Sequence, residues 1–172
     1  MMRCCALITA VVALANRAQA GSPPLKAGDL VILECLGENA ETDGNRYLDG
    51  RARERTVGLA AKTGRGFTGT RWKVVKLDKG AFGFECQGNV KGNRWLDGRT
   101  GDGTVGLAPK TGGRFTGTRW KLHDRGEGKI QLECRREVEG PRWLDGVTGD
   151  ATVGLTDDDT LSGTFWKVRK VK

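Results

Sequence analysis

Apolar and polar residues alternate in short runs along most of the chain, with the period of two that is typical of half-buried β-strands. In the first run Val31, Leu33 and Cys35 share one face, and Glu34 points to the other. No helical periodicity longer than one turn interrupts these runs, and glycines separate them. The pattern therefore predicts an all-β protein. The same alternation returns twice, at Phe82, Phe84 and Cys86 and at Ile130, Leu132 and Cys134.

These runs belong to a unit that occurs three times at a fixed spacing. The block Arg46-Tyr-Leu-Asp-Gly50 returns with Trp in place of Tyr at residues 94–98 and 142–146. A Thr-Val-Gly-Leu block follows it at 56–59, 104–107 and 152–155, and a tryptophan closes each unit at Trp72, Trp120 and Trp166. A fixed period indicates an architecture built from stacked or symmetric units.

Each unit supplies about four short strands, so three units supply about twelve. No unit has enough apolar surface to fold alone, so the three must share a core. We expect one β-trefoil domain over 21–172, a six-stranded barrel capped by three hairpins, with repeats at about 29–77, 80–125 and 128–172. A three-bladed or open β array is the alternative.

The first twenty residues lie outside the repeat. Arg3 precedes an apolar run over 4–15 that is too short to cross a bilayer comfortably, and Ala18-Gln19-Ala20 matches a signal-peptidase site. Residues 1–20 therefore predict a secretory signal peptide and an extracellular mature chain with no membrane span. An uncleaved N-terminal anchor is the alternative.

The chain is basic, with 29 Lys and Arg against 21 Asp and Glu and a net charge of +8. Such a surface can attract polyanions, although interspersed charges of both signs are also typical of ordinary solvated surface. The glycine-rich loops do not match the phosphate-loop spacing, so we expect no nucleotide site. We also expect no specific nucleic-acid partner.

Cys35, Cys86 and Cys134 are the cysteines that remain after signal removal, an odd number for a secreted protein. They occupy equivalent positions on the inward row, where small apolar side chains pack. A disulfide between two of them and a tris-thiolate metal site are the alternatives.

The Arg-[Tyr/Trp]-Leu-Asp-Gly, Val-Gly-Leu and Thr-Arg-Trp blocks resemble the fascin-like branch of the β-trefoils, over about Leu25 to Lys172. The resemblance implies the trefoil fold but not one function, since trefoils include lectins, cytokines, protease inhibitors and actin bundlers. Thr70-Arg-Trp72 stands where ricin-type lectins have Gln-x-Trp, so a ricin-type galactose site is not implied.

One candidate site pairs an aromatic ring with a carboxylate. In each unit the aromatic of the Leu-Asp-Gly strand stands two residues before the aspartate, so alternation places both on the face opposite the leucine. Such a pair can stack on a sugar ring and bind its hydroxyls; the alternative is an aromatic that covers a hairpin beside an Asp-Gly turn. These residues are Tyr47 and Asp49, Trp95 and Asp97, and Trp143 and Asp145.

A second candidate is the loop before each closing strand. In units one and two it carries basic and aromatic residues that could meet an anion, whereas unit three has Asp157-Asp158-Asp159 there. Plain loop variation is the alternative. The residues are Lys62, Arg65 and Phe67, and Lys110, Arg114 and Phe115.

Catalysis has little support in the sequence. His123 is the only histidine and has no copy in the other units, and Ser162 has no nucleophile motif around it. We expect a secreted, non-catalytic binding module without cofactor or metal, which is lectin-like and could bind a glycan or anionic polysaccharide multivalently. A trefoil-type protease inhibitor and a fascin-like module that binds actin or another protein are the alternatives.

Overall fold

The structure, a computed structural model, describes residues 25–37 and 44–171. The predicted signal peptide lies outside the described residues. Within the described residues, twelve short strands and four 3-10 turns follow one another. The strands are β1 (Leu30–Cys35), β2 (Tyr47–Arg51), β3 (Thr56–Ala60), β4 (Trp72–Lys76), β5 (Phe82–Cys86), β6 (Trp95–Arg99), β7 (Thr104–Ala108), β8 (Trp120–Asp124), β9 (Lys129–Cys134), β10 (Trp143–Val147), β11 (Thr152–Thr156) and β12 (Trp166–Val171). The turns are η1 (Thr68–Thr70), η2 (Asp78–Gly80), η3 (Thr116–Thr118) and η4 (Ser162–Thr164).

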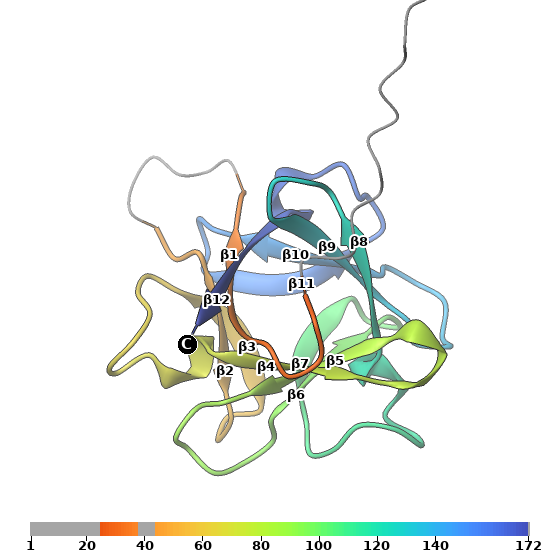
Figure 1. The fold of residues 1–172 in the computed structure, drawn as a ribbon. Coiled ribbons are helices and arrows are strands. Elements are labelled where there is room, and N and C mark those ends of the chain that lie inside the picture. Colours follow the sequence, from red (N-terminus) through yellow and green to blue (C-terminus); the bar gives the residue numbers. More distant parts are fainter. Residues whose placement is uncertain (1–24, 38–43, 172) are drawn as a thin grey trace, which may run out of the picture.

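The first and last strands close the molecule. β1 and β12 pair antiparallel from Leu30 opposite Val171 to Cys35 opposite Trp166, and they lie side by side in Figure 1. β4 pairs with β5 and β8 with β9, and shorter contacts join β1 to β4, β5 to β8 and β9 to β12. The other six strands form three hairpins, β2–β3, β6–β7 and β10–β11.

The hairpins are not separate caps, and this corrects the expected fold class. Each hairpin joins a neighbouring strand at one residue pair, such as Glu34 opposite Tyr47, and the three hairpins also pair with one another through β3, β7 and β11. All twelve strands therefore form one sheet: a closed 10-strand antiparallel barrel with two extra strands. The all-β class and the number of strands are as expected, but the β-trefoil topology of a six-stranded barrel under three caps is wrong.

The glycine of each Thr-Val-Gly-Leu block explains how the hairpins meet. Leu59 N donates to Ala151 O at 2.9 Å, Leu107 N to Arg55 O at 3.0 Å and Leu155 N to Gly103 O at 2.8 Å. A Cβ at the preceding Gly58, Gly106 or Gly154 would lie 3.1, 3.0 or 3.3 Å from the same carbonyl oxygen. Only glycine lets the hairpin edges approach closely enough to satisfy each other's backbone groups.

The closing tryptophans form the centre of the shared core. Trp72, Trp120 and Trp166 are fully buried. Each indole nitrogen donates to the carbonyl oxygen of the hairpin leucine of its own unit, at 2.9 to 3.0 Å. The polar end of each ring is thereby satisfied while its apolar body packs, as a buried tryptophan requires.

The three cysteines are buried and free, so the expected packing role is confirmed and a disulfide among them is wrong. Each thiol lies against glycine carbonyls of a neighbouring hairpin and 3-10 turn; Cys86 Sγ, for example, is 3.5 Å from both Gly50 O and Gly69 O. Burial raises the pKa of the Cys134 thiol to about 11. No group of three or more His, Cys, Asp or Glu in 25–37 and 44–171 could hold a metal ion. Within the same ranges no helix is long and apolar enough to cross a membrane.

Candidate functional site

Two pockets lie at equivalent places in units one and three. The first, of about 280 Å³, contains Asp49, Gly50, Phe67 and Gly69 in its wall, with Gly88 from the next unit. The second, of about 260 Å³, contains Asp145, Gly146, Leu161 and Gly163, with Gly37 from unit one. The threefold repeat relates these residues position by position, so the two pockets are copies of one design.

The aspartate is held in the pocket wall by the strand on one side and the 3-10 turn on the other. In each unit one carboxylate oxygen lies in the space that a Cβ on the turn glycine would occupy. The glycine is therefore required by the close approach of the aspartate. The pairs are Asp49 with Gly69, Asp97 with Gly117 and Asp145 with Gly163.

Burial raises the pKa of all three aspartates, but their partners differ. Asp49 lies 3.8 Å from the Arg51 guanidinium, which partly offsets burial. The charges of Arg136 and Arg99 act in the same way on Asp97. Burial alone accounts for the raised pKa of Asp145, and no hydrogen bond or ion pair from the described residues reaches its carboxylate. Asp145 is thus the least compensated acid of the set.

The equivalent place in unit two differs from the two pockets at one lining position. Where Gly37 and Gly88 line the other pockets, the third unit supplies Arg136. Its guanidinium lies at the Gly98 carbonyl oxygen, with Arg136 Nη1 3.5 Å away. The Arg136 side chain therefore occupies the space beside Asp97 that is open beside Asp49 and Asp145.

The predicted aromatic rings are placed differently from the aspartates. Tyr47 is covered by Arg169, whose guanidinium lies 4.9 Å from the ring centroid and 3.2 Å from Glu34. Trp143 packs against His123 with ring centroids 4.8 Å apart, and His123 contacts Glu133 at 2.8 Å. Neither Tyr47 nor Trp143 lines a pocket with its aspartate.

Trp95, the third aromatic, lies over β5. A Cβ on Gly83 would be 3.0 Å from its ring carbon Cζ3. The three rings thus pack against residues of β12, β8 and β5. Asp49 and Asp145, in contrast, lie in the pocket walls.

The loops before the closing strands contribute one ring to a pocket. Phe67 lines the Asp49 pocket, whereas Lys62 and Arg65 are exposed and do not. In unit two, Lys110 and Arg114 lie 5.8 and 5.3 Å from the centroid of the Phe115 ring, a cation–π arrangement. Asp49 and Phe67 came from different candidate sets, and the structure brings them together.

The acidic loop of unit three is tied to the residues on both sides of the junction with unit two. Asp159 pairs with Arg125 at 3.3 Å, and its carbonyl oxygen accepts a hydrogen bond from the Gln131 amide at 2.6 Å. Asp158 accepts hydrogen bonds from the backbone N–H and hydroxyl of Thr160. In this shorter loop Leu161 takes the place of Phe67 at the pocket.

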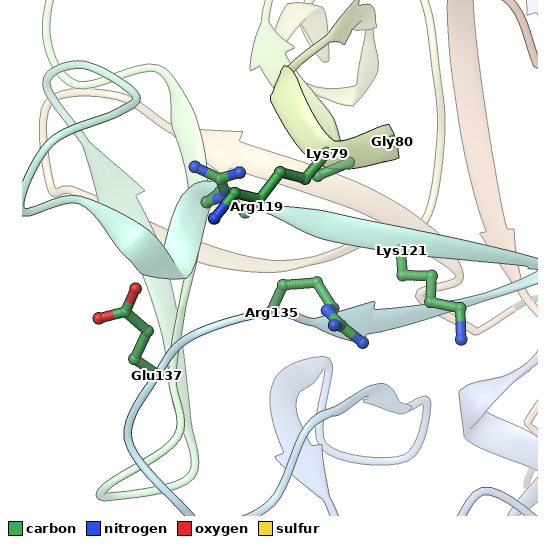
Figure 2. A pocket seen from close by; sticks show the side chains of 7 residues that line it. Lys79, Gly80, Arg119, Lys121, Arg135 and Glu137 are labelled. Atoms are coloured by element: carbon green, nitrogen blue, oxygen red, sulfur yellow. The ribbon is translucent and has the colours of Figure 1, made fainter.

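A further cavity, of about 460 Å³, lies between units two and three and is lined by Lys79, Arg119, Lys121 and Arg135 (Figure 2). None of these residues is among the sequence candidates. Aligning the repeats does reveal that the basic residues here are unusual, because Glu127 and Leu36 stand in place of Lys79 and Arg135 at the next equivalent junction. Alignment within the chain shows the substitution but not that the side chains meet.

No protein-family model and no curated protein matches this sequence. Among solved structures, the chain is similar to the designed threefold symmetric protein ThreeFoil, with 21% identity, a TM-score of 0.62 and coverage of 83% of this chain and 99% of that one. A salivary protein from Culex, of the Cysteine and Tryptophan-Rich family, matches with 15% identity and a TM-score of 0.57 over 86% of this chain and 99% of its own.

An endo-β-galactosidase from Clostridium perfringens that releases GlcNAcα1-4Gal matches with 11% identity and a TM-score of 0.63 over 84% of this chain. The chain spans 33% of that enzyme's length. At these identities the likeness concerns the fold alone. It supports a trefoil-like arrangement of the three units and does not confirm the resemblance to the fascin-like branch.

Proposed function

We propose that this chain is a secreted, non-catalytic module that binds carbohydrate through two equivalent pockets, at Asp49 and at Asp145. The observation that carries the proposal is the recurrence of one pocket design in units one and three. The likeness to a carbohydrate-active enzyme is consistent with it at the level of the fold. That enzyme's activity is not carried over to this chain, which corresponds to about a third of its length.

The chemistry of the pocket wall suits a sugar ring. Phe67 is 37% exposed and Leu161 is 43% exposed, so each pocket has an apolar surface that the C–H face of a pyranose can cover. A carboxylate beside that surface can accept hydrogen bonds from two neighbouring hydroxyl groups. A small apolar contact with a few fixed polar groups is the usual composition of a ligand pocket.

Two sites on one small module would raise avidity for a branched or repeating glycan without strengthening either contact. The Phe67 ring and the Leu161 side chain would give the two pockets different affinities, since an aromatic face packs more closely on a sugar than an aliphatic side chain does. We expect the Asp49 pocket to be the stronger one.

A glycan array tests this proposal with the purified protein and the double variant Asp49→Asn/Asp145→Asn. The double variant should lower array signals by at least about tenfold, because each pocket loses hydrogen bonds to a charged acceptor. Asp97→Asn is the matched control and should keep its signals within about twofold, since Arg136 occupies that position. Binding of no neutral glycan by the native protein, or equal losses in control and double variant, would contradict the proposal.

A further inference from the structure

The cavity of about 460 Å³ is lined by more basic side chains than the Asp49 and Asp145 pockets. Lys79 and Gly80 come from η2, Arg119 directly precedes β8, Lys121 lies in β8, and Arg135 follows β9 (Figure 2). Four basic side chains and one acid, Glu137, line this basic cleft. In the view of Figure 2, Lys79 extends toward the Arg119 guanidinium, and Glu137 lies on the opposite side from Lys121.

Arg119 is fixed in the cleft by its neighbours. Its guanidinium contacts the Asp78 carboxylate at 2.7 Å and the Asp78 carbonyl oxygen at 3.3 Å, and its side chain is 21% exposed. Its own carbonyl oxygen accepts a hydrogen bond from Arg135 N at 2.7 Å, which links the two arginines. A guanidinium held in this way loses little conformational entropy when an anion binds.

The acids around the basic cleft do not neutralise it. Glu133 is shared by Lys121 at 3.7 Å, Arg135 at 3.3 Å and His123 at 2.8 Å. Lys79 forms no ion pair with any residue in the described ranges, and Lys121 and Arg135 are each 52% exposed. Even with Asp78, Glu133 and Glu137 counted, the basic groups are in excess and keep donors accessible.

The charge is also concentrated here against the threefold symmetry. At the equivalent junction of units three and one, Glu127, Phe165 and Leu36 stand for Lys79, Arg119 and Arg135, and Lys167 alone keeps its charge. Lys79 and Glu127 have the same left-handed backbone, with φ of 52° and 53°, so the alignment holds in space. The fold therefore does not require these cations.

We propose that the basic cleft binds a sulfate ester group of an acidic polysaccharide. Arginine and lysine donors converging on one small cavity suit a compact tetrahedral oxyanion. A single-stranded nucleic acid would need an aromatic face for its bases, and none of the described residues that line the cleft is aromatic. The site goes beyond the proposed function, because it uses different residues and a charged ligand group.

The test measures binding to immobilised dextran sulfate, with neutral dextran and phosphorylated dextran as further surfaces. Lys79→Gln/Arg135→Gln should weaken binding to dextran sulfate by at least about tenfold at low ionic strength, because two contacts to anionic groups are lost. The control Lys73→Gln/Lys167→Gln removes the same charge from exposed positions equivalent to Lys121 and should change binding by less than about twofold. Preference for sulfated over phosphorylated dextran supports the assignment, and the reverse preference overturns it.

Equal weakening in both double variants would overturn the proposal, because it would indicate attraction by net charge alone. Binding of a single-stranded oligonucleotide as tightly as dextran sulfate would overturn it as well. Thermal melting checks that the variants fold, and the single change Lys79→Gln, at an exposed residue, serves if the double variant does not. Asp49→Asn/Asp145→Asn should retain dextran sulfate binding, so failure of this site and failure of the sugar pockets can be told apart.

Discussion

At the scale of single residues, Asp145 shows how the pockets lower the stability of the fold. Its carboxylate lies against Gly163, burial raises its pKa, and no cation or donor from the described residues offsets that burial. A charge held without compensation destabilises a folded protein. Groups of this kind are often retained because a ligand uses them, at the expense of stability.

Asp145→Asn should therefore stabilise the protein near neutral pH. Burial raises the pKa of Asp145 in the folded state. The contribution of Asp145 to the free energy of unfolding is therefore fully present below its unfolded-state pKa and is lost as the pH rises through its folded-state pKa. The asparagine variant lacks this loss, so its free energy of unfolding should exceed the native value at about pH 7 and converge with it at about pH 3. Urea unfolding at both pH values measures the difference.

Asp97→Asn provides the comparison, since the charge of Arg136 already offsets part of the burial of Asp97. Its gain in the free energy of unfolding at neutral pH should be smaller than that of Asp145→Asn. If Asp145→Asn were destabilising at neutral pH, the carboxylate would have a stabilising contact in the native state and the interpretation of the pocket would change.

Sequence reasoning placed the buried residues better than the half-buried ones. Period-two alternation identified the core positions of Trp120 and Cys134, because burial on one face is what the alternation encodes. It also put Tyr47 and Asp49 on one face but could not show that Arg169, from the far end of the chain, covers the ring. The local alternation of apolar and polar residues does not show which side chains distant in sequence will be in contact.

At the scale of elements, one glycine in each hairpin sets how closely the hairpin approaches a buried cysteine and tryptophan. A Cβ on Gly98 would lie 2.8 Å from Cys134 Sγ and 3.1 Å from Trp120 Cη2. Gly50 and Gly146 meet the equivalent cysteine and tryptophan at nearly the same distances. The Leu-Asp-Gly block therefore ends in glycine because the neighbouring unit packs directly on the backbone.

Gly98→Ala should destabilise the protein by about 1–3 kcal/mol, the usual range for overpacking a dense core. Cys134→Ala in the same background should restore part of that loss, because it removes the sulfur that the new methyl group would meet. Chemical denaturation of the wild type, both single variants and the double variant gives the coupling free energy. Strictly additive effects would mean that the strand shifts away from Cys134 and that the packing is less tight than described.

The pairing of elements was predicted less well than their existence. Each strand carries its own pattern, so twelve strands could be expected from local sequence alone. Which strand edges pair depends on how the three hairpins approach one another. In the sequence, that approach is indicated only by the glycine in Thr-Val-Gly-Leu. Gly58, for example, lets Leu59 N reach Ala151 O of another unit.

At the scale of the whole molecule, departures from threefold symmetry decide how many sites there are. Two pockets share one design, and the third position is filled by Arg136, whose guanidinium lies at Gly98 O. The loops of units one and two carry similar basic and aromatic residues. The two pockets nevertheless lie in units one and three, because the residue that differs at unit two, Arg136, comes from the start of the next unit.

Arg136→Gly should open the third pocket and change the number of carbohydrate sites from two to three. The substitution copies Gly37 and Gly88, so the backbone is expected to tolerate it. Isothermal titration with the best neutral glycan from the array measures the stoichiometry. Adding Asp97→Asn should return the value to two, and an unchanged stoichiometry in Arg136→Gly would show that Arg136 is not what closes this position.

The pairing of β1 with β12 has a consequence for how the protein is made. Residues 30–35 find their longest partner only at 166–171, so most of the chain must be synthesised before the barrel can close. Contacts so distant in sequence slow folding, and a growing chain keeps the open edge of β1 exposed meanwhile. Pairing of β12 with β1 is therefore expected to be a late step of folding.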